Sequence, residues 1–302
     1  MTDTLRAFYE GKRVLVTGGA GFIGSHVAQA LVELGARVTV LDNFSTGNIN
    51  NLRAIFSSIT IHYADVTSSY STLKATENKD LVFHLAAFIS VPQSVQNPAY
   101  CKKINIDGTK NILRGSAHNG VSHLIFSSSS AVYGNTDTIC SEDSALMPTS
   151  PYAESKMIGE ELCKEYAITT TLATTCLRYF NVYGERQSPS SEYAGVVARF
   201  KMALLNNQPI TIFGDGTQTR DFIEVSEVVR ANLMLGRNTA SKGEIYNIAS
   251  GKSINLLQLI EKLEHDLKTS RTNTHFMPQR EGDIQHSTAQ CSKYLQALSS
   301  VL

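Results

Sequence analysis

The chain has 302 residues, of which 42% are hydrophobic and 18% charged, with a formal net charge of zero at pH 7. This length predicts one large domain, or one domain with a smaller partner, and the neutral balance argues against a nucleic-acid-binding surface. The charged segment 1–12 does not resemble a signal peptide, and no apolar stretch approaches the length of a membrane span. The five cysteines are scattered without a CxxC pair, so we expect reduced cytoplasmic thiols and neither a disulfide framework nor a metal site.

Short apolar runs alternate with longer amphipathic stretches through the first part of the chain. The apolar runs predict strands at Arg13–Thr17, Val38–Leu41, Ile59–Tyr63, Leu81–Leu85, His123–Ser127 and Thr175–Arg178. The amphipathic stretches predict helices, including Phe22–Leu34, Ile104–His118 and Tyr152–Tyr166. Such alternation is typical of an α/β fold, so we predict a doubly wound parallel (Rossmann) sheet covered by helices on both faces.

The pattern loosens beyond Asn181. We predict a polar loop at Gln187–Tyr193, a helix at Val196–Leu205, a strand at Ile210–Phe213 and a glycine-rich turn at Gly214–Gly216. Two further helices are predicted at Val225–Leu235 and Leu256–Leu267. We therefore predict a dinucleotide-binding domain over residues 1–179 and a smaller α+β substrate domain over residues 180–302. Whether segments of the second interleave with the first is left open by the sequence.

A glycine-rich loop joins the first predicted strand to the first predicted helix. Gly18, Gly21 and Gly24 let the backbone turn sharply and approach a pyrophosphate, and Phe22 and Ile23 open the helix whose N-terminus faces that group. A glycine triplet alone occurs in many turns, but its position between a strand and a helix favours dinucleotide binding.

Further cofactor contacts are expected where the next strands end, since ligands bind beyond the carboxyl edge of such a sheet. Asp42, at the end of the second strand, can accept both ribose hydroxyls and would repel a 2′-phosphate, which favours NAD over NADP. Other positions suited to the adenine and ribose are Asp65, Val66, Leu85, Ala86 and Ala87. The alternatives, a turn residue at Asp42 and simple tight packing at the alanines, remain open.

Tyr152 and Lys156 lie one helical turn apart and form a candidate proton-transfer pair. We expect the nearby cation to lower the pKa of the Tyr152 phenol. The same spacing recurs at Tyr70 and Lys74, so spacing cannot choose between the pairs. Context favours Tyr152, because it follows the fifth strand, which ends in the hydroxyl-rich run 127–130, whereas Tyr70 lies in a stretch that is typical of an outer crossover helix.

Six segments together resemble the extended short-chain dehydrogenases, the NAD-dependent sugar epimerases and dehydratases. In chain order they are TGGAGFIGSH at 17–26, Asp42-Asn43, HLAA at 84–87, SSSSAVYG at 127–134, SPYAESK at 150–156 and LRYFNVYG at 177–184. The resemblance runs from about residue 12 to about residue 295. It is strongest to the UDP-hexose 4-epimerases, in particular those acting on N-acetylhexosamines.

The resemblance implies a catalytic triad of Ser129, Tyr152 and Lys156, with Ser128 and Ser130 as the alternatives to the serine. Tyr152 would take the O4 proton while hydride passes from C4 to NAD, and the hydride would return to the other face of the rotated 4-keto sugar. Additional implied contacts of NAD are Asn43, Ser45, Thr46, Gly47, Asn105, Ser127 and Tyr179, together with Tyr152 and Lys156 themselves. Relatives commonly form homodimers through helices that match Ile104–His118 and Tyr152–Tyr166.

The resemblance also implies a binding site for the UDP-sugar. Arg220 and Arg280 would hold the diphosphate through guanidinium forks, and Asp283 the uridine ribose. The remaining implied contacts are Ser90, Ser129, Ser130, Tyr152, Asn181, Phe213 and Ser287. Ser287 stands where hexose-only epimerases often carry Tyr, and Ser90-Val91-Pro92 resembles the N-acetylhexosamine subgroup, so we expect room for a C2 acetamido group.

Related chemistries are less well matched. Nucleotide-sugar 4,6-dehydratases carry an Asp-Glu pair where Ser130 and Ala131 stand, and UDP-glucuronate decarboxylases carry Glu at Ala131. We predict a 4-epimerase of UDP-GlcNAc and UDP-GalNAc, with UDP-Glc and UDP-Gal as further possible substrates. The alternatives are another NAD-dependent enzyme of nucleotide sugars, such as a UDP-uronate epimerase or dehydratase, and a non-catalytic NAD-binding sensor.

Overall fold

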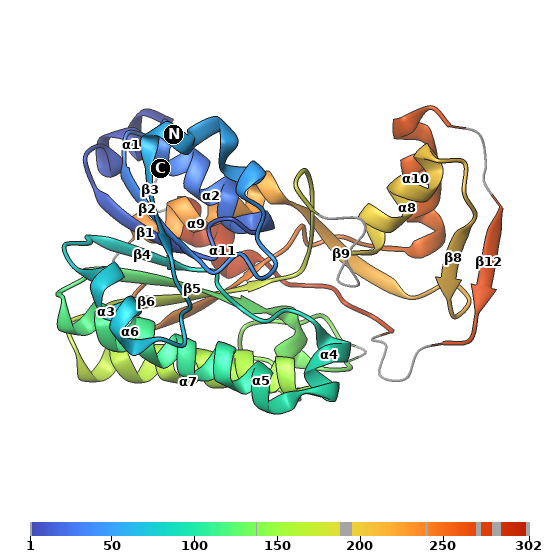
Figure 1. Cartoon of the computed structure of the whole chain (residues 1–302). Coiled ribbons are helices and arrows are strands. Elements are labelled where there is room, and N and C mark those ends of the chain that lie inside the picture. Colours follow the sequence, from blue (N-terminus) through green and yellow to red (C-terminus); the bar gives the residue numbers. More distant parts are fainter. Residues whose placement is uncertain are drawn as a thin grey trace.

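The computed structural model describes residues 2–136, 138–187, 195–238, 241–269, 273–279 and 285–299. Its main body is built on a parallel sheet, and a smaller lobe projects from one side of that body (Figure 1). None of the helices in these ranges is long and apolar enough to cross a membrane.

Seven parallel strands form the main sheet in the order β10-β6-β5-β4-β1-β2-β3. Their bounds are β1 Arg13–Thr17, β2 Arg37–Asp42, β3 Ile59–Tyr63, β4 Leu81–His84, β5 His123–Ser129, β6 Ala173–Tyr179 and β10 Glu244–Ile248. The first six strands follow the order 3-2-1-4-5-6 of dinucleotide-binding folds, which confirms the predicted fold class. The order reverses between β1 and β4, so their carboxyl ends form the crevice where a ligand binds.

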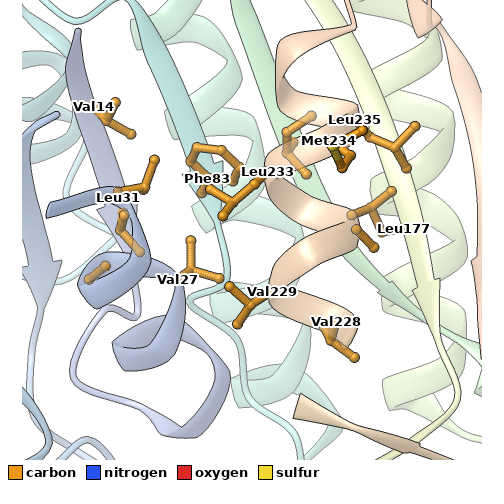
Figure 2. Close-up of a cluster of buried hydrophobic side chains, with 14 of the residues drawn as sticks. Val14, Val27, Leu31, Phe83, Leu177, Val228, Val229, Leu233, Met234 and Leu235 are labelled. Atoms are coloured by element: carbon orange, nitrogen blue, oxygen red, sulfur yellow. The ribbon is translucent and has the colours of Figure 1, made fainter. Parts of the chain in front are cut away.

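Helices cover both faces of this sheet (Figure 1). One face packs against α1 Thr2–Tyr9, α2 Phe22–Glu33, η1 Ile49–Ser58, α9 Val225–Arg237 and α11 Ser292–Ser299, and the other against α3 Ser69–Thr76, α6 Gly108–His118 and α7 Pro151–Thr169. Strand periodicity explains the division, because Val14 and Val16 join the first core cluster while Leu15 joins the second. Figure 2 shows the first cluster, in which Phe83 and Leu177 of the sheet meet Leu233 of α9.

The sequence predicts a single helix at 104–118 in the crossover from β4 to β5, but the structure divides this crossover into several helical segments. It runs through α4 Val91–Gln96, α5 Pro98–Lys102, the π-helical turn η2 Lys103–Asp107 and α6. Asn97 caps α5 by accepting a hydrogen bond from the Tyr100 amide, and Pro98 occupies the first turn. A π-turn inside a helix is often found at a functional site.

The smaller lobe contains two short sheets and two helices. A three-stranded sheet pairs β7 Asn181–Tyr183, β9 Thr219–Glu224 and β11 Ser253–Asn255, and β8 Ile210–Phe213 pairs in parallel with β12 Thr274–Met277. The helices α8 Val196–Leu205 and α10 Leu256–Leu267 begin where the sequence predicts and share a core with β8. Most of the predicted loop at 187–193 lies outside the described residues.

The chain passes between the two parts of the molecule more than once. After β9 it returns to the main body as α9 and β10, and β10 pairs with β6 at the edge of the main sheet. Segments of the C-terminal part thus lie within the layers of the larger body. The division into domains at residue 179 stays a prediction.

Candidate active site

Tyr152 lies in the first turn of α7. Ser150 caps this helix by accepting a hydrogen bond from the Ala153 amide at 3.2 Å, and Pro151 occupies the first helical position. The Tyr152 amide, which has no partner within the helix, donates to Ser94 Oγ on α4 at 3.2 Å. The local sequence therefore starts α7 directly before Tyr152, and the hydrogen bond to Ser94 holds the backbone from which the phenol projects.

The side chains of Tyr152 and Lys156 meet the carboxyl end of β5. The Tyr152 phenol lies near the Ser129 side chain, which acts to lower its pKa, and the Lys156 ammonium donates to the Ser127 carbonyl at 2.7 Å. Of the three candidate serines, Ser129 is thus the one that influences the pKa of the phenol, and its Oγ accepts the Ala131 amide at 3.2 Å. Tyr70, in contrast, lies on the outer helix α3 with 71% of its surface exposed.

The two ionisable groups of this cluster are shifted toward their neutral forms. Burial raises the pKa of the Tyr152 phenol, and the Ser129 hydrogen bond opposes that rise. Burial lowers the pKa of the Lys156 ammonium to about 8. The expectation that the lysine lowers the tyrosine pKa was therefore wrong for this structure, because desolvation dominates and the ammonium is bonded to the Ser127 carbonyl.

The glycine loop packs directly against the end of β4. Gly18 has a φ of +67°, and a Cβ at this position would lie 2.7 Å from the Ala86 amide nitrogen. A Cβ on Gly24 would overlap the Gly18 carbonyl oxygen. These contacts require glycine at both positions and leave a bare backbone at the N-terminus of α2, which is the cradle that a pyrophosphate needs.

Asp42 is buried beside this loop. Its carboxylate accepts the Ala20 amide at 2.9 Å and the Phe44 amide at 2.8 Å, and burial raises its pKa. A carboxylate has further acceptor positions, so the predicted ribose contact stays a prediction. Two of the predicted cofactor residues, Thr46 and Gly47, line an adjacent pocket of about 520 Å³.

The other predicted residues near β2 and β3 also contact one another. The Asn43 amide donates to Asp65 at 2.7 Å and its oxygen accepts the Ser45 amide at 3.0 Å. These bonds hold the loop after β2 against the loop after β3. Val66 belongs to the second core cluster, and Ala86 packs against that cluster. Leu85 packs against the first cluster instead.

Asn105 is 3% exposed and lies in the π-turn η2. Its oxygen accepts the Phe88 amide at 2.7 Å, and its nitrogen donates to the Phe88 carbonyl at 3.0 Å and to Ser155 Oγ at 2.8 Å. The residue thus ties the segment after β4 to α7, one position before Lys156. Its predicted contact with the cofactor stays a prediction.

A chain of buried hydrogen bonds, missed by the sequence analysis, links the glycine loop to this π-turn. The Ala86 amide donates to Thr17 Oγ1 at 3.2 Å, and Thr109 Oγ1 donates to the Asn105 carbonyl at 2.6 Å. Between them, His84 contacts Thr17 through Nδ1 at 2.7 Å and Thr109 through Nε2 at 3.0 Å. Thr109 gives its hydroxyl proton to the Asn105 carbonyl, so it must accept the hydrogen bond from His84 Nε2. The imidazole proton therefore lies on Nε2, and Nδ1 accepts from Thr17.

Several predicted substrate residues lie on β7, which follows β6 in the chain, and on β9, which pairs with β7. Asn181 begins β7, directly after Tyr179 and Phe180, and its amide donates to the Asp221 carbonyl on β9 at 3.0 Å. Arg220 precedes Asp221, and its guanidinium donates to the carbonyls of Thr219 and Gln285 at 2.9 and 3.4 Å. The structure therefore places Arg220 beside the segment that leads to Ser287.

Other predicted substrate residues are distributed around these strands. Ser287 is 8% exposed, Ser90 caps α4 at the start of the crossover from β4 to β5, and Ser130 begins the short helix η3 Ser130–Tyr133. The Tyr179 hydroxyl donates to Asn232 on α9 at 2.9 Å. Arg280 and Asp283 lie outside the described residues.

A second pocket, of about 240 Å³, lies near Phe213 in the smaller lobe. It is lined by Gly214, Asp215, Gln218, Gln279 and Gln285. Gln218 is buried, and its nitrogen donates to the Phe213 carbonyl at 2.6 Å. Its oxygen has no hydrogen-bond partner among the described residues. A buried acceptor in a pocket fits a ligand that carries an N–H donor.

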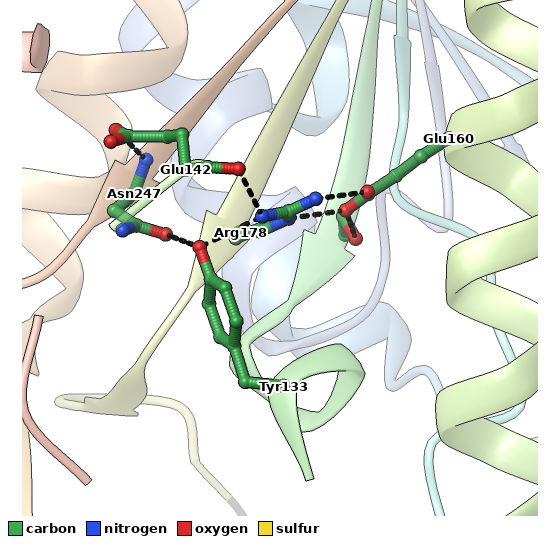
Figure 3. A network of polar contacts seen from close by, with 6 residues as sticks. Tyr133, Glu142, Glu160, Arg178 and Asn247 are labelled. Atoms are coloured by element: carbon green, nitrogen blue, oxygen red, sulfur yellow. Dashed lines mark hydrogen bonds and ion pairs between the residues drawn. The ribbon is translucent and has the colours of Figure 1, made fainter. Parts of the chain in front are cut away.

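Behind β5 lies a polar network that the sequence analysis also missed (Figure 3). Arg178 on β6 and Glu160 on α7 form an ion pair in which both side chains are at most 3% exposed. Arg178 also donates to the Tyr133 hydroxyl at 2.8 Å, and that hydroxyl donates to Asn247 at 2.6 Å. One signal for it was present, because Glu160 follows Lys156 by four residues on the face of the helix that carries Tyr152.

The fold and the site together define a class, the dinucleotide-dependent enzymes with a Ser-Tyr-Lys cluster at the carboxyl edge of a parallel sheet. Residues 14–249 match the NAD dependent epimerase/dehydratase family, and the chain belongs to that family. This finding confirms the predicted family and NAD as its cofactor. The described residues contain no group of three or more His, Cys, Asp or Glu side chains that could hold a metal ion.

Three similar proteins carry sugar-nucleotide activities in their names. The chain is 41% identical over 275 residues to a putative UDP-glucose 4-epimerase of Methanocaldococcus jannaschii, which covers 90% of this chain and 87% of that protein. It is 37% identical over 273 residues to a UDP-N-acetyl-alpha-D-glucosaminuronate decarboxylase of Bacillus cytotoxicus, with 88% and 84% covered. A solved UDP-N-acetylglucosamine 4-epimerase of Methanobrevibacter ruminantium, in complex with UDP-N-acetylmuramic acid, has a TM-score of 0.91 at 38% identity, with 96% and 92% covered.

Proposed function

We propose that this protein is an NAD-dependent 4-epimerase of UDP-sugars that acts on UDP-GlcNAc and UDP-GalNAc. The observation that carries the proposal is the cluster at the carboxyl end of β5, where the Tyr152 phenol lies near the Ser129 side chain and the Lys156 ammonium, one turn further along α7, donates to the Ser127 carbonyl. A phenol and a hydroxyl in this arrangement can hold one substrate hydroxyl and exchange its proton.

The residues of the glycine loop fit a dinucleotide, because a side chain at Gly18 would meet the segment after β4 and one at Gly24 would meet the loop itself, so both positions leave the backbone bare. NAD bound there would supply a hydride acceptor for C4 of the sugar and would regain its oxidised form once the hydride returned to the sugar. The net reaction therefore needs no external oxidant.

The chain's own residues carry the proton. Tyr152 accepts the O4 proton as C4 is oxidised and returns it when C4 is reduced, and Ser129 orients that oxygen by hydrogen bonding. The buried Lys156 cation stabilises the phenolate, because opposite charges attract more strongly away from water.

The proposed substrate class rests on Ser287 and on the site's lack of a carboxylate at residue 131. Ser287 is small and buried, which leaves space beside the sugar for a C2 acetamido group. The relative that is named as a decarboxylase makes decarboxylation of a UDP-uronate the second candidate. Ala131 disfavours it, since a methyl group stands where the related decarboxylases carry Glu.

We expect the purified enzyme to interconvert UDP-GlcNAc and UDP-GalNAc with a higher kcat/KM than UDP-Glc and UDP-Gal. In the variant Ser287→Tyr, the phenol would occupy the acetamido space, and the ratio of the two kcat/KM values should fall on the order of tenfold or more. Progress of each reaction is measured by separating the nucleotide sugars. A strong preference of the unmodified enzyme for UDP-Glc contradicts the proposed substrate, and carbon dioxide release from a UDP-N-acetylhexosaminuronate supports the second candidate.

A further inference from the structure

Three side chains on one face of α7, each four residues from the next, contact the three consecutive serines that end β5. The Tyr152 phenol lies near the Ser129 side chain, and Lys156 donates to the Ser127 carbonyl at 2.7 Å. Glu160 completes the row, because Ser128 Oγ donates to its Oε1. The first two contacts belong to the proposed proton transfer, and the third has no part in it.

Glu160 is more buried than Tyr152 and Ser129 and as buried as Lys156. It is 3% exposed, and its two oxygens accept a fork from Arg178, with Nε at 2.9 Å from Oε1 and Nη2 at 2.7 Å from Oε2. Well-packed apolar residues often stabilise a core as much as a buried ion pair does. Stability alone therefore does not account for a charged pair at this position.

We propose that Glu160 is a positioning residue for catalysis, which holds Ser128 and thereby fixes Ser129 against Tyr152. A proton transfer depends on the separation of the reacting atoms, so a small displacement of the Ser129 hydroxyl lowers the rate without weakening substrate binding. The inference rests on the proposed function, since it assigns a role in the same reaction.

The same network reaches the segment that carries Ser287. Beyond Tyr133, the Asn247 nitrogen donates to the carbonyls of Cys140 and Gln290 at 3.0 and 3.4 Å. The Cys140 amide in turn donates to the Thr288 carbonyl at 2.9 Å, next to Ser287. Glu160 thus stands at one end of a polar chain whose other end holds the proposed specificity residue.

Charged and titratable groups face Glu160 from its own helix and from the neighbouring strand. Lys156 lies one turn before it on α7, and Arg178 and the Cys176 thiol face it from β6. Tyr133 on η3 contacts Arg178 from the far side. Removing the carboxylate leaves the Arg178 charge uncompensated, which favours the phenolate of Tyr152 and disfavours the Lys156 ammonium.

The first test is Ser128→Ala, which removes the link and leaves the ion pair intact. We expect kcat for the preferred UDP-sugar to fall about tenfold, less than the ~100-fold that a misplacement of one ångström can cost, with KM nearly unchanged. The matched control is Ser116→Ala, a buried serine on α6 whose hydroxyl has no partner within the described parts of the chain. This control should keep the wild-type kcat.

The second test is Glu160→Gln, with Glu161→Gln on the exposed side of the same helix as its control. We expect a larger fall in kcat for Glu160→Gln and a shift of the acid limb of its kcat profile to lower pH, whereas a purely structural role would leave the profile in place. If this variant fails to fold, Ser128→Ala decides alone. Wild-type kcat in Ser128→Ala overturns the inference, while an inactive wild-type enzyme would instead overturn the proposed function.

Discussion

Tyr152 and Lys156 show how burial sets the chemistry of single residues in this site. Desolvation moves both pKa values toward the neutral form, upward for the phenol and down to about 8 for the ammonium. The cost of burying each charge is therefore larger than the interactions with the surrounding residues that oppose it.

Two buried histidines make the folded protein sensitive to acid. Burial lowers the pKa of His84 to about 3 and of His123 to about 4, and both side chains are at most 1% exposed. The unfolded chain binds protons at these residues below pH ~6.5, whereas the folded chain does not until much lower pH. Stability is therefore lost as pH falls below about 6.5.

From pH 7 to pH 5 we expect the free energy of unfolding to decrease by about 2 kcal/mol for each of these histidines. Urea unfolding at the two pH values measures the change. Asp65 and Asp80 do not account for it, because their lowered pKa values place their effect below pH ~4. Equal stability at pH 5 and pH 7 would show that the histidines are not neutral in the folded state.

At the scale of elements, the turn between β1 and α2 depends on backbone shape. Gly18→Ala would place a Cβ 2.7 Å from the Ala86 amide nitrogen at a residue with a φ of +67°. We expect a loss of about 1–3 kcal/mol in stability and weaker retention of NAD, because the loop must move away from β4. Ultraviolet absorbance of the purified protein measures bound NAD. As a control, Gly120→Ala has a similar positive φ but nothing within 4 Å of its Cβ, so it should retain NAD normally.

The sequence analysis located the strands and helices of the main body because buried strands and amphipathic helices leave clear periodic patterns. All six strands predicted before residue 180 are present in the structure, and α8, β8, α9 and α10 lie where they were expected. It did not identify β10, whose pairing with β6 joins residues far apart in the chain. It also did not detect the π-turn at 103–107, which depends on the buried contacts of Asn105.

At the scale of the whole molecule, the parts of the candidate site that could be predicted are the residues that belong to short local sequence motifs. The sequence motifs indicated Tyr152 and Lys156, and the structure brings both to the end of β5. Spacing placed Glu160 on the helix face that carries Tyr152 and Lys156, but its ion pair with Arg178 was not predictable, because Arg178 lies on a separate element. The roles of the individual site residues and the homodimer stay predictions.

The central claim is that this enzyme inverts C4 of a UDP-sugar through the phenol of Tyr152. The most direct measurement is proton NMR of UDP-GlcNAc incubated with the wild-type enzyme and with Tyr152→Phe, combined with calorimetric binding of UDP. We predict C4 inversion by the wild-type enzyme, a rate lower by ~10²–10⁴-fold in the variant, and the same affinity of both for UDP. Inversion by Tyr152→Phe at the wild-type rate would contradict the claim.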